Sequence, residues 1–312
     1  MSEPVAGVTV AICTRNRPAE LERCVRSLTS DTSPTAPMFV EVLVVDDGEL
    51  SAAVVERVRN SVERWGGRFR YGRTSRPGGL FAARLIAIQQ ASGSVVLFLD
   101  DDVEVAPGYL ERLVARYLAL PAAAGVGGVP VPNRRSRLLR RLFARLFLLD
   151  SGHPGRLSAS GFNYSITQWE DVGELFRSEF LSGCNMSFRR EALAGVEPVA
   201  WLQHYIQGDD LYLALRARAA GELWVDPALR VLHHVSPTSR TSAADAAPSV
   251  IYNLFQLLRL QDPRWWNYLA FHWTTFGLTL MALLRPGRQT VALGYLRGLY
   301  AAVRDVSSGR SS

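Results

Sequence analysis

The stretch Ser94-Val-Val-Leu-Phe-Leu-Asp100-Asp101-Asp102-Val103 decides the fold. Its apolar run, residues 95–99, has the length and composition of a strand buried on both faces of a parallel sheet. The run ends in three carboxylates, and ligands of an open α/β sheet bind beyond the carboxyl ends of its strands. Adjacent carboxylates repel one another, and a hard divalent cation relieves that repulsion. The alternative is an acidic turn that caps the next helix, and this stretch alone favours neither.

Strands and helices alternate on both sides of this stretch. Apolar runs at residues 8–13 and 40–45 predict two further buried strands, and apolar residues at helical spacing follow the first of them. This alternation predicts an α/β fold with a doubly wound, mostly parallel sheet and helices on both faces. The second run ends in Asp46 and Asp47. Acidic side chains at two neighbouring strand ends point to one shared crevice.

The composition is that of a globular protein with an anionic partner. Of the 312 residues, 48% are hydrophobic, and the net charge is +6. Nucleotide phosphates, nucleic acid or anionic lipid would suit this charge. All basic residues are arginine, which excludes a catalytic lysine. The three cysteines are far apart and fit a reducing cytoplasm better than a disulfide framework or a zinc site.

Four separated motifs carry a resemblance to a known family. They are Ile12-Cys-Thr-Arg-Asn-Arg-Pro18, Val44-Val-Asp-Asp-Gly48, Gly78-Gly-Leu-Phe-Ala-Ala-Arg84 and Phe98-Leu-Asp-Asp-Asp102. In order and spacing they resemble the family 2 glycosyltransferases of GT-A fold, over roughly the first three quarters of the chain. The resemblance implies an inverting, metal-dependent transfer of a sugar from a nucleoside-diphosphate donor, foremost a UDP-sugar, to a hydroxyl acceptor. Mn²⁺ or Mg²⁺ would be the cofactor.

The same resemblance assigns nucleotide-sugar binding to seven residues. They are Cys13, Thr14, Arg15, Asp47, Arg84, Asp100 and Asp101. The loop at Thr14 and Arg15, with Asp47, would hold the nucleoside, and Arg84 would meet the diphosphate. Arg15 stands where the family often has an aromatic residue, and a guanidinium can also stack on a base. The alternative for Arg84 is a solvated helix face.

The metal ligands implied by the resemblance come from two parts of the chain. Asp102 would be the principal ligand, and Asp100 would lie near the ribose or the metal. His233 best matches a family position that joins the metal or the phosphates, and imidazole is a plausible Mn²⁺ ligand. Local register alone does not separate His233 from His234. A polar segment at residues 236–245 is expected as a loop over the donor, with Arg240 as a phosphate contact, or else as a simple linker.

Two further segments are predicted to hold the catalytic and acceptor sides of the site. Gln207-Gly-Asp-Asp-Leu211 opens a predicted helix, where a carboxylate can serve as a cap. By the resemblance, Asp210 is the general base that takes the acceptor's proton, and Asp209 replaces a glutamate. On the acceptor side, Gly183 permits close approach of a ligand, while Ser182 and Asn185 offer hydrogen bonds.

Membrane association is expected from two further segments. Residues 133–149 interleave arginine with leucine and phenylalanine, typical of an amphipathic helix on an anionic membrane, or else of an ordinary surface helix. No recognised nucleic-acid module accompanies them. Residues 265–284 carry no charge; an interfacial helix is the first interpretation, ahead of a packed soluble helix and a membrane span.

The sequence therefore predicts a GT-A catalytic domain over residues 1–247 and a helical, membrane-associating segment over 248–312. We expect a peripheral or monotopic protein on the cytoplasmic side of the plasma membrane. Its acceptor would be a sugar, lipid-linked or a precursor of a cell-surface polysaccharide. Two rival hypotheses remain: a catalytically silent carbohydrate- or lipid-binding scaffold, and a nucleotidyltransferase. The second would need a glycine-rich loop after the first strand, and residues 13–16 contain no glycine.

Overall fold

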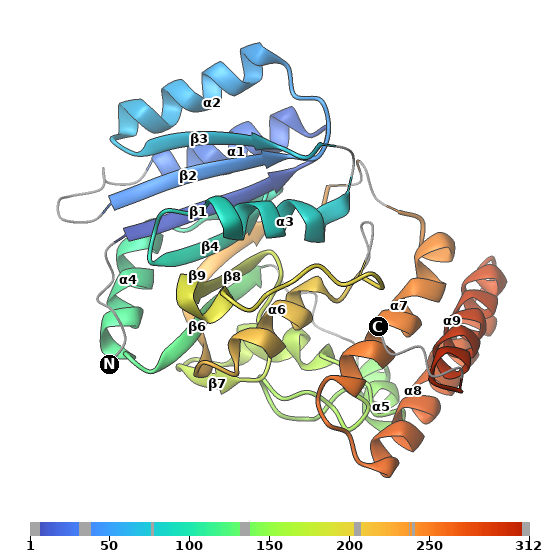
Figure 1. Ribbon diagram of the computed structural model, residues 1–312. Coiled ribbons are helices and arrows are strands. Elements are labelled where there is room, and N and C mark those ends of the chain that lie inside the picture. Colours follow the sequence, from blue (N-terminus) through green and yellow to red (C-terminus); the bar gives the residue numbers. More distant parts are fainter. Residues whose placement is uncertain are drawn as a thin grey trace.

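A mixed sheet forms the centre of the molecule (Figure 1). The computed structural model describes residues 7–30, 39–75, 78–131, 138–202, 207–236, 238 and 241–307. Within these ranges the sheet has nine strands: eight follow the order β3-β2-β1-β4-β8-β6-β9-β5, and β7 pairs with β9 outside this order. The strands are β1 (Gly7–Thr14), β2 (Phe39–Asp46), β3 (Arg68–Arg73), β4 (Val95–Asp100), β5 (Val103–Val105), β6 (Ala123–Val131), β7 (Phe176–Ser178), β8 (Asn185–Arg189) and β9 (Glu222–His233).

Helices cover both faces of the sheet, as the alternating pattern predicted. The described helices are α1 (Pro18–Thr29), α2 (Ala52–Trp65), α3 (Gly79–Gln90), α4 (Tyr109–Ala119), α5 (Leu138–Leu146), α6 (Asp209–Ala217), α7 (Ala243–Arg259), α8 (Trp265–Leu283) and α9 (Gln289–Ser307). Residues of α1, α2 and α4 pack on one face of the sheet. Residues of α3, α6 and α7 pack on the other. The strands β1, β2 and β4 are therefore buried from both sides, which explains their continuous apolar runs.

The sheet is parallel over β3, β2, β1 and β4, as expected, but β8 enters between β4 and β6 with antiparallel pairing. The register places Leu99 opposite Asn185, so β8 begins where β4 ends. At the far edge, β5 pairs antiparallel with β9 and sets Val103 opposite His233. The carboxyl-terminal ends of β1, β2, β4 and β9 and the start of β8 therefore lie along the same side of the sheet.

The C-terminal helices share the main hydrophobic core. Ile251, Leu257 and Phe271 belong to the same buried cluster as Ala11 and Phe98 of the sheet. The expected boundary after residue 247 falls inside α7, because that helix already begins at Ala243. Among the residues that the structure describes, no helix combines the length and the apolar character that crossing a membrane requires.

Candidate active site

Three side chains at the sheet edge have the arrangement of a metal site. One ligand atom each from Asp100, Asp102 and His233 lies within 4.8 Å of the others. The backbone holds them together: β5 pairs with β9 next to His233, and the amide of His234 donates to the carbonyl of Asp102 at 2.9 Å. Two carboxylates and one imidazole are a donor set that suits Mn²⁺ and tolerates Mg²⁺. The residues present therefore fit the cation that the sequence predicted.

Burial and neighbouring charges shift the pKa values of all three side chains in this cluster. Oδ1 of Asp102 lies 3.1 Å from Nε2 of His233, and Oδ2 of Asp102 accepts a hydrogen bond from the Ser236 amide at 2.8 Å. Although burial disfavours its charge, these contacts hold the pKa of Asp102 at about 2. Burial also opposes protonation of His233, but Asp102 raises the pKa of that imidazole to about 10. Burial raises the pKa of Asp100 to about 6 against the opposing charge of Arg84.

The alternation of side chains along a strand separates the two histidines. His233 faces Asp102 in the cluster, whereas Nε2 of His234 lies 2.6 Å from Oε1 of Glu104. Glu104 also contacts Arg23 at 3.3 Å, so His234 belongs to a separate group of charges. Of these two neighbours, His233 is the one that the structure places in the cluster with Asp100 and Asp102, and its role as a metal ligand stays a prediction.

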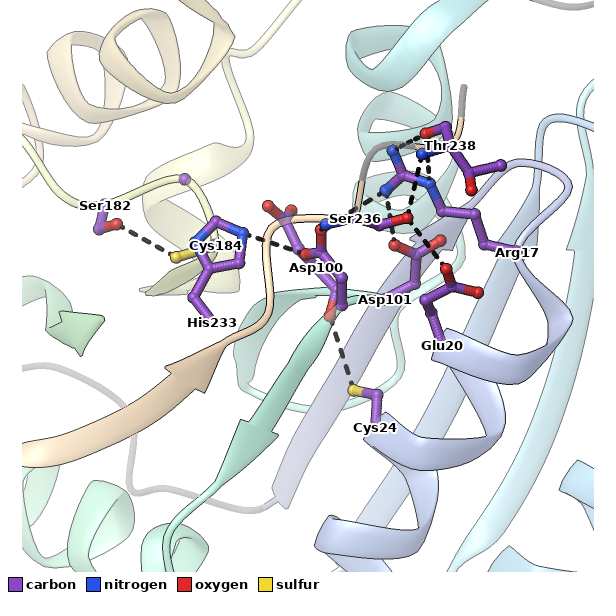
Figure 2. A network of polar contacts seen from close by, with 12 residues as sticks. Arg17, Glu20, Cys24, Asp100, Asp101, Ser182, Cys184, His233, Ser236 and Thr238 are labelled. Carbon is purple, nitrogen blue, oxygen red and sulfur yellow. Dashed lines mark hydrogen bonds and ion pairs between the residues drawn. The ribbon is translucent and has the colours of Figure 1, made fainter. Parts of the chain in front are cut away.

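Asp101 is not part of the cluster; it hydrogen-bonds to residues at the end of β1 and after it, and Arg17 among them contacts the segment after β9. Its carboxylate accepts from Thr14 Oγ1 at 2.7 Å and from Arg17 Nη1 at 3.0 Å. Arg17 also donates through Nε to the carbonyl of Thr238 at 2.9 Å, and Ser236 Oγ donates to Glu20 (Figure 2). Asp101 therefore has partners within the protein that join α1 to the segment after β9. Its predicted contact with the donor stays a prediction.

Sequence reasoning missed Arg17 and Ser236. A signal for Arg17 was present, since it lies in the first motif and an arginine at that loop can reach an acidic strand end. Ser236 was expected only as part of a loop, and its amide is found on Asp102. Arg240, the expected phosphate contact, lies outside the described residues.

The other expected nucleotide ligands line the neighbouring strand ends. Asp47 accepts from Thr74 Oγ1 at 2.8 Å and from the amides of Gly78 and Gly79 at 2.8 and 3.2 Å. Gly79 has φ of +86°, which a residue with a side chain rarely adopts. Asp47 thus shapes the start of α3. Cys13 is buried next to Asp100, and burial raises the pKa of its thiol to about 12, so the thiol stays neutral.

Arg15 is half-buried beside Thr14 in the loop that follows β1. The roles predicted for Cys13, Arg15 and Asp47 stay predictions.

Arg84 links the two halves of the site from α3. Its Nη1 donates to Oδ2 of Asp209 at 2.6 Å, and its Nη2 donates to Asp100 at 3.2 Å and to the carbonyl of Gly183 at 2.7 Å. The side chain is 3% exposed, so the solvated helix face is wrong for this residue. The geometry gives Arg84 internal acidic partners, and its expected contact with a diphosphate stays a prediction.

Asp209 and Asp210 begin α6 with different surroundings. Asp209 is buried against Arg84, whereas Asp210 is only half-buried and accepts from the amide of Leu211 at 2.8 Å. Burial first, and then the charge of Asp209, raise the pKa of Asp210 to about 6. A Cβ added to Gly183 would lie 3.2 Å from Oδ2 of Asp210. The carboxylate therefore rests directly over that glycine.

The three expected acceptor-side residues differ in what they offer. Gly183 lies at the site, beneath Asp210. Ser182 is buried and its Oγ lies 3.4 Å from Sγ of Cys184. Asn185 is fully buried: its amide nitrogen donates to the carbonyl of Leu229 at 2.9 Å, and its oxygen accepts from Tyr109. The geometry thus gives Asn185 a place in the core, joining β8 to β9 and α4. Contact of Ser182 or Asn185 with an acceptor stays a prediction.

Solved structures share this fold along almost the whole chain. They include GalNAc-T7 with UDP, GalNAc and Mn²⁺ (TM-score 0.59, 18% identity, 98% of this chain and 58% of that one). A mannosyltransferase of Pyrobaculum calidifontis in complex with GDP-Man and Mn²⁺ gives a TM-score of 0.57 at 16% identity, over 97% of this chain and 88% of that one. S. aureus TarS 1-349 with UDP-GlcNAc gives 0.58 at 14%, over 95% and 81%. These likenesses establish the GT-A fold.

Similar sequences point the same way. An inactive polypeptide N-acetylgalactosaminyltransferase-like protein 5 of Macaca fascicularis is 26% identical over 81% of this chain and 56% of its own length. Glycosyltransferase AglE of Haloferax volcanii is 24% identical over 71% of this chain and 64% of its own length. The chain thus spans less than two thirds of either relative. The model of glycosyl transferase family 2 matches residues 9–195, more than half of the chain. The chain belongs to glycosyl transferase family 2.

Proposed function

We propose that this protein transfers a sugar, with inversion, from a nucleoside-diphosphate donor to a hydroxyl acceptor and requires a divalent cation. The observation that carries the proposal is the connection through Arg84. One guanidinium contacts Asp100 of the cation cluster at 3.2 Å and Asp209, the neighbour of Asp210, at 2.6 Å. Such a bridge would set the proposed cation site and the proposed carboxylate base side by side, as an inverting displacement requires.

Asp100, Asp102 and His233 would hold the Mn²⁺ or Mg²⁺ ion. When bound, the cation would neutralise charge on the departing diphosphate. Ser236 and Arg17 would orient the carboxylates next to the cation. The amide of Ser236 donates to Asp102, and Arg17 donates to Asp101. The proposed cation site therefore depends on the segment after β9 being in place.

Asp210 would accept the proton of the acceptor hydroxyl. As the acceptor oxygen forms its bond to the anomeric carbon, the bond from that carbon to the diphosphate oxygen breaks, and the proton passes to Asp210. With a pKa raised to about 6, the carboxylate is ionised at neutral pH and is a stronger base than an exposed aspartate. The carboxylate lies against Gly183, where the absence of a side chain leaves room for it.

For the donor we propose a UDP-sugar, since two of the solved structures that share the fold are described with UDP or UDP-GlcNAc. For the acceptor we propose a lipid-linked sugar, such as a precursor of a surface polysaccharide. The support is the layer of C-terminal helices against α6: a Cβ added to Gly208 would lie 2.8 Å from Leu257 of α7. The start of α6, beside Asp210, thus lies against α7, which packs on α9, a helix with exposed apolar residues.

Thermal unfolding with UDP, GDP, ADP and dTDP, each with and without Mn²⁺, tests the donor site. A ligand that binds only the folded state raises the midpoint by mass action. We expect metal-dependent stabilisation by UDP that disappears in Asp102→Ala and persists in Glu174→Ala, which removes an exposed carboxylate. Release of UDP from UDP-sugars, and the anomeric configuration of the product, then test transfer. Binding of UDP and Mn²⁺ without turnover on any acceptor would contradict the proposal and favour the scaffold hypothesis.

A further inference from the structure

Two helices that lie about 130 residues apart in sequence are joined end to side on the surface (Figure 1). The indole Nε1 of Trp273 in α8 donates to the carbonyl of Leu146 at the end of α5 at 2.8 Å. Thr274 Oγ1 donates to the carbonyl of Phe147 at 2.7 Å, and the Phe147 and Trp273 rings stack at 5.0 Å. These contacts fix α5 and α8 as one unit.

The outer side of this unit is apolar. On α8, Leu269, Trp273 and Phe276 follow one another at helical spacing, and 59%, 43% and 54% of each is exposed. On α5, Leu139, Leu142 and Leu146 are more than half exposed. Trp273 contacts the end of α5 beside Leu146, so the two rows meet. We call these six residues the α5–α8 face. Exposed apolar groups in such a contiguous set mark an interaction site.

The charges around the face select its partner. α5 carries Arg140, Arg141 and Arg145 and has no acidic residue, and α8 carries no charged residue at all. A second copy of the chain would bring the same arginines against each other in a two-fold contact, which is unfavourable. An anionic lipid surface would instead pair with the arginines and accept the leucine and aromatic side chains below its headgroups.

The packing of α8 against the domain also determines its orientation relative to a bilayer. Phe271, Thr274, Thr275 and Gly277 are buried on its inner side, and Phe147 occupies the space a side chain at Gly277 would need. α8 is therefore held flat on the domain, and only its outer side is available. We propose that the α5–α8 face docks this protein, in the plane of the interface, on a bilayer that contains anionic lipid.

Flotation of the full-length chain with vesicles tests the proposal. Vesicles of phosphatidylcholine with about one third phosphatidylglycerol should carry the protein, and pure phosphatidylcholine vesicles should carry much less. Leu142→Gln with Leu269→Gln should lower the partition coefficient at least about tenfold. Arg141→Gln with Arg145→Gln should lower it about thirtyfold at low salt.

A control pair on α4, Arg112→Gln with Leu118→Gln, removes the same types of exposed side chain elsewhere and should bind like the wild type. Unchanged thermal midpoints would show that all variants fold. Wild-type protein that stays in the bottom fraction of the gradient, or variants that float as well as the wild type, would overturn the proposal. So would a dimer, seen in sedimentation, that the leucine substitutions dissociate while no variant binds vesicles. Vesicle binding is measured without turnover, so it stands or falls separately from the proposed transfer.

Discussion

Nη1 of Arg84 lies 2.6 Å from Oδ2 of Asp209 in an ion pair whose side chains are 3% and 7% exposed. The same guanidinium contacts Asp100, and its Cζ lies 5.9 Å from the centroid of the Phe98 ring. α3, β4 and α6 therefore meet at one buried cation. Because Arg84 and Asp209 are almost fully buried, each depends on the other for compensation, and losing Arg84 leaves Asp209 buried without its cation.

Arg84→Gln should lower the free energy of unfolding by about 3–5 kcal/mol, since Asp209 would stay buried without its cation. Urea denaturation at neutral pH measures this loss. The double variant Arg84→Gln with Asp209→Asn should recover part of it, because the uncompensated carboxylate is removed as well. Arg112→Gln, an exposed arginine of α4, is the matched control. A loss for Arg84→Gln no larger than the control's would mean that the pair does not stabilise the fold.

The acid limb of kcat/KM should report the ionisation of Asp210. A base must be unprotonated, so activity should increase about tenfold per pH unit below a pKa of about 6 and level off above it. Asp210→Asn should lower kcat by about 10²–10⁴ while leaving the midpoint shift with UDP and Mn²⁺ in place. A flat profile across that range in the wild type, or substantial activity in Asp210→Asn, would assign the proton transfer to another group.

The two neighbouring histidines provide a matched pair for the cation. His233→Gln should weaken Mn²⁺ binding by on the order of a hundredfold, because it removes a ligand of the cluster. His234→Gln breaks only the contact with Glu104 at 2.6 Å and should leave the affinity nearly unchanged. Calorimetric titration with Mn²⁺ gives both values. Equal losses in the two variants would argue against the cluster as the cation site.

Gly183→Ala should reduce kcat more than it reduces stability. The added Cβ would approach Oδ2 of Asp210 to 3.2 Å and push the carboxylate from its place. Backbone strain is not involved, since Gly183 is absent from the described glycines with positive φ. Gly173→Ala is the control, because nothing lies within 4 Å of a Cβ there. Steady-state kinetics of both variants, with their thermal midpoints, would separate displacement of Asp210 from general destabilisation.

Much of the fold could be predicted from local pattern, and the reason is physical. The buried strands β1, β2 and β4 read as continuous apolar runs because helices cover both faces. The antiparallel entry of β8 could not be predicted in this way, because strand direction depends on contacts distant in sequence. Asp100, Asp102 and His233 were expected together, and the structure brings them together.

The contacts within the site were harder to predict. Neighbours such as Asp101 and Asp102 are chemically identical. Only the turn after β4 decides that Asp101 lies 3.0 Å from Arg17, whereas Asp102 lies 3.1 Å from His233 and 3.8 Å from Arg17. Arg84 was expected to meet a diphosphate, and its acidic partners come from segments 16 and 125 residues away. The join between α5 and α8 likewise needs a tertiary contact between segments that each looked only amphipathic or apolar.

Arg17 and Arg84, two cations of the site, are guanidinium groups, and the chain contains no lysine. A guanidinium keeps its proton throughout the range in which proteins stay folded. The positive charge of these two groups is therefore a fixed background that neither alkali nor acetylation can remove. The carboxylates and His233 of the cluster change protonation with pH, so pH changes their charges against two constant positive charges.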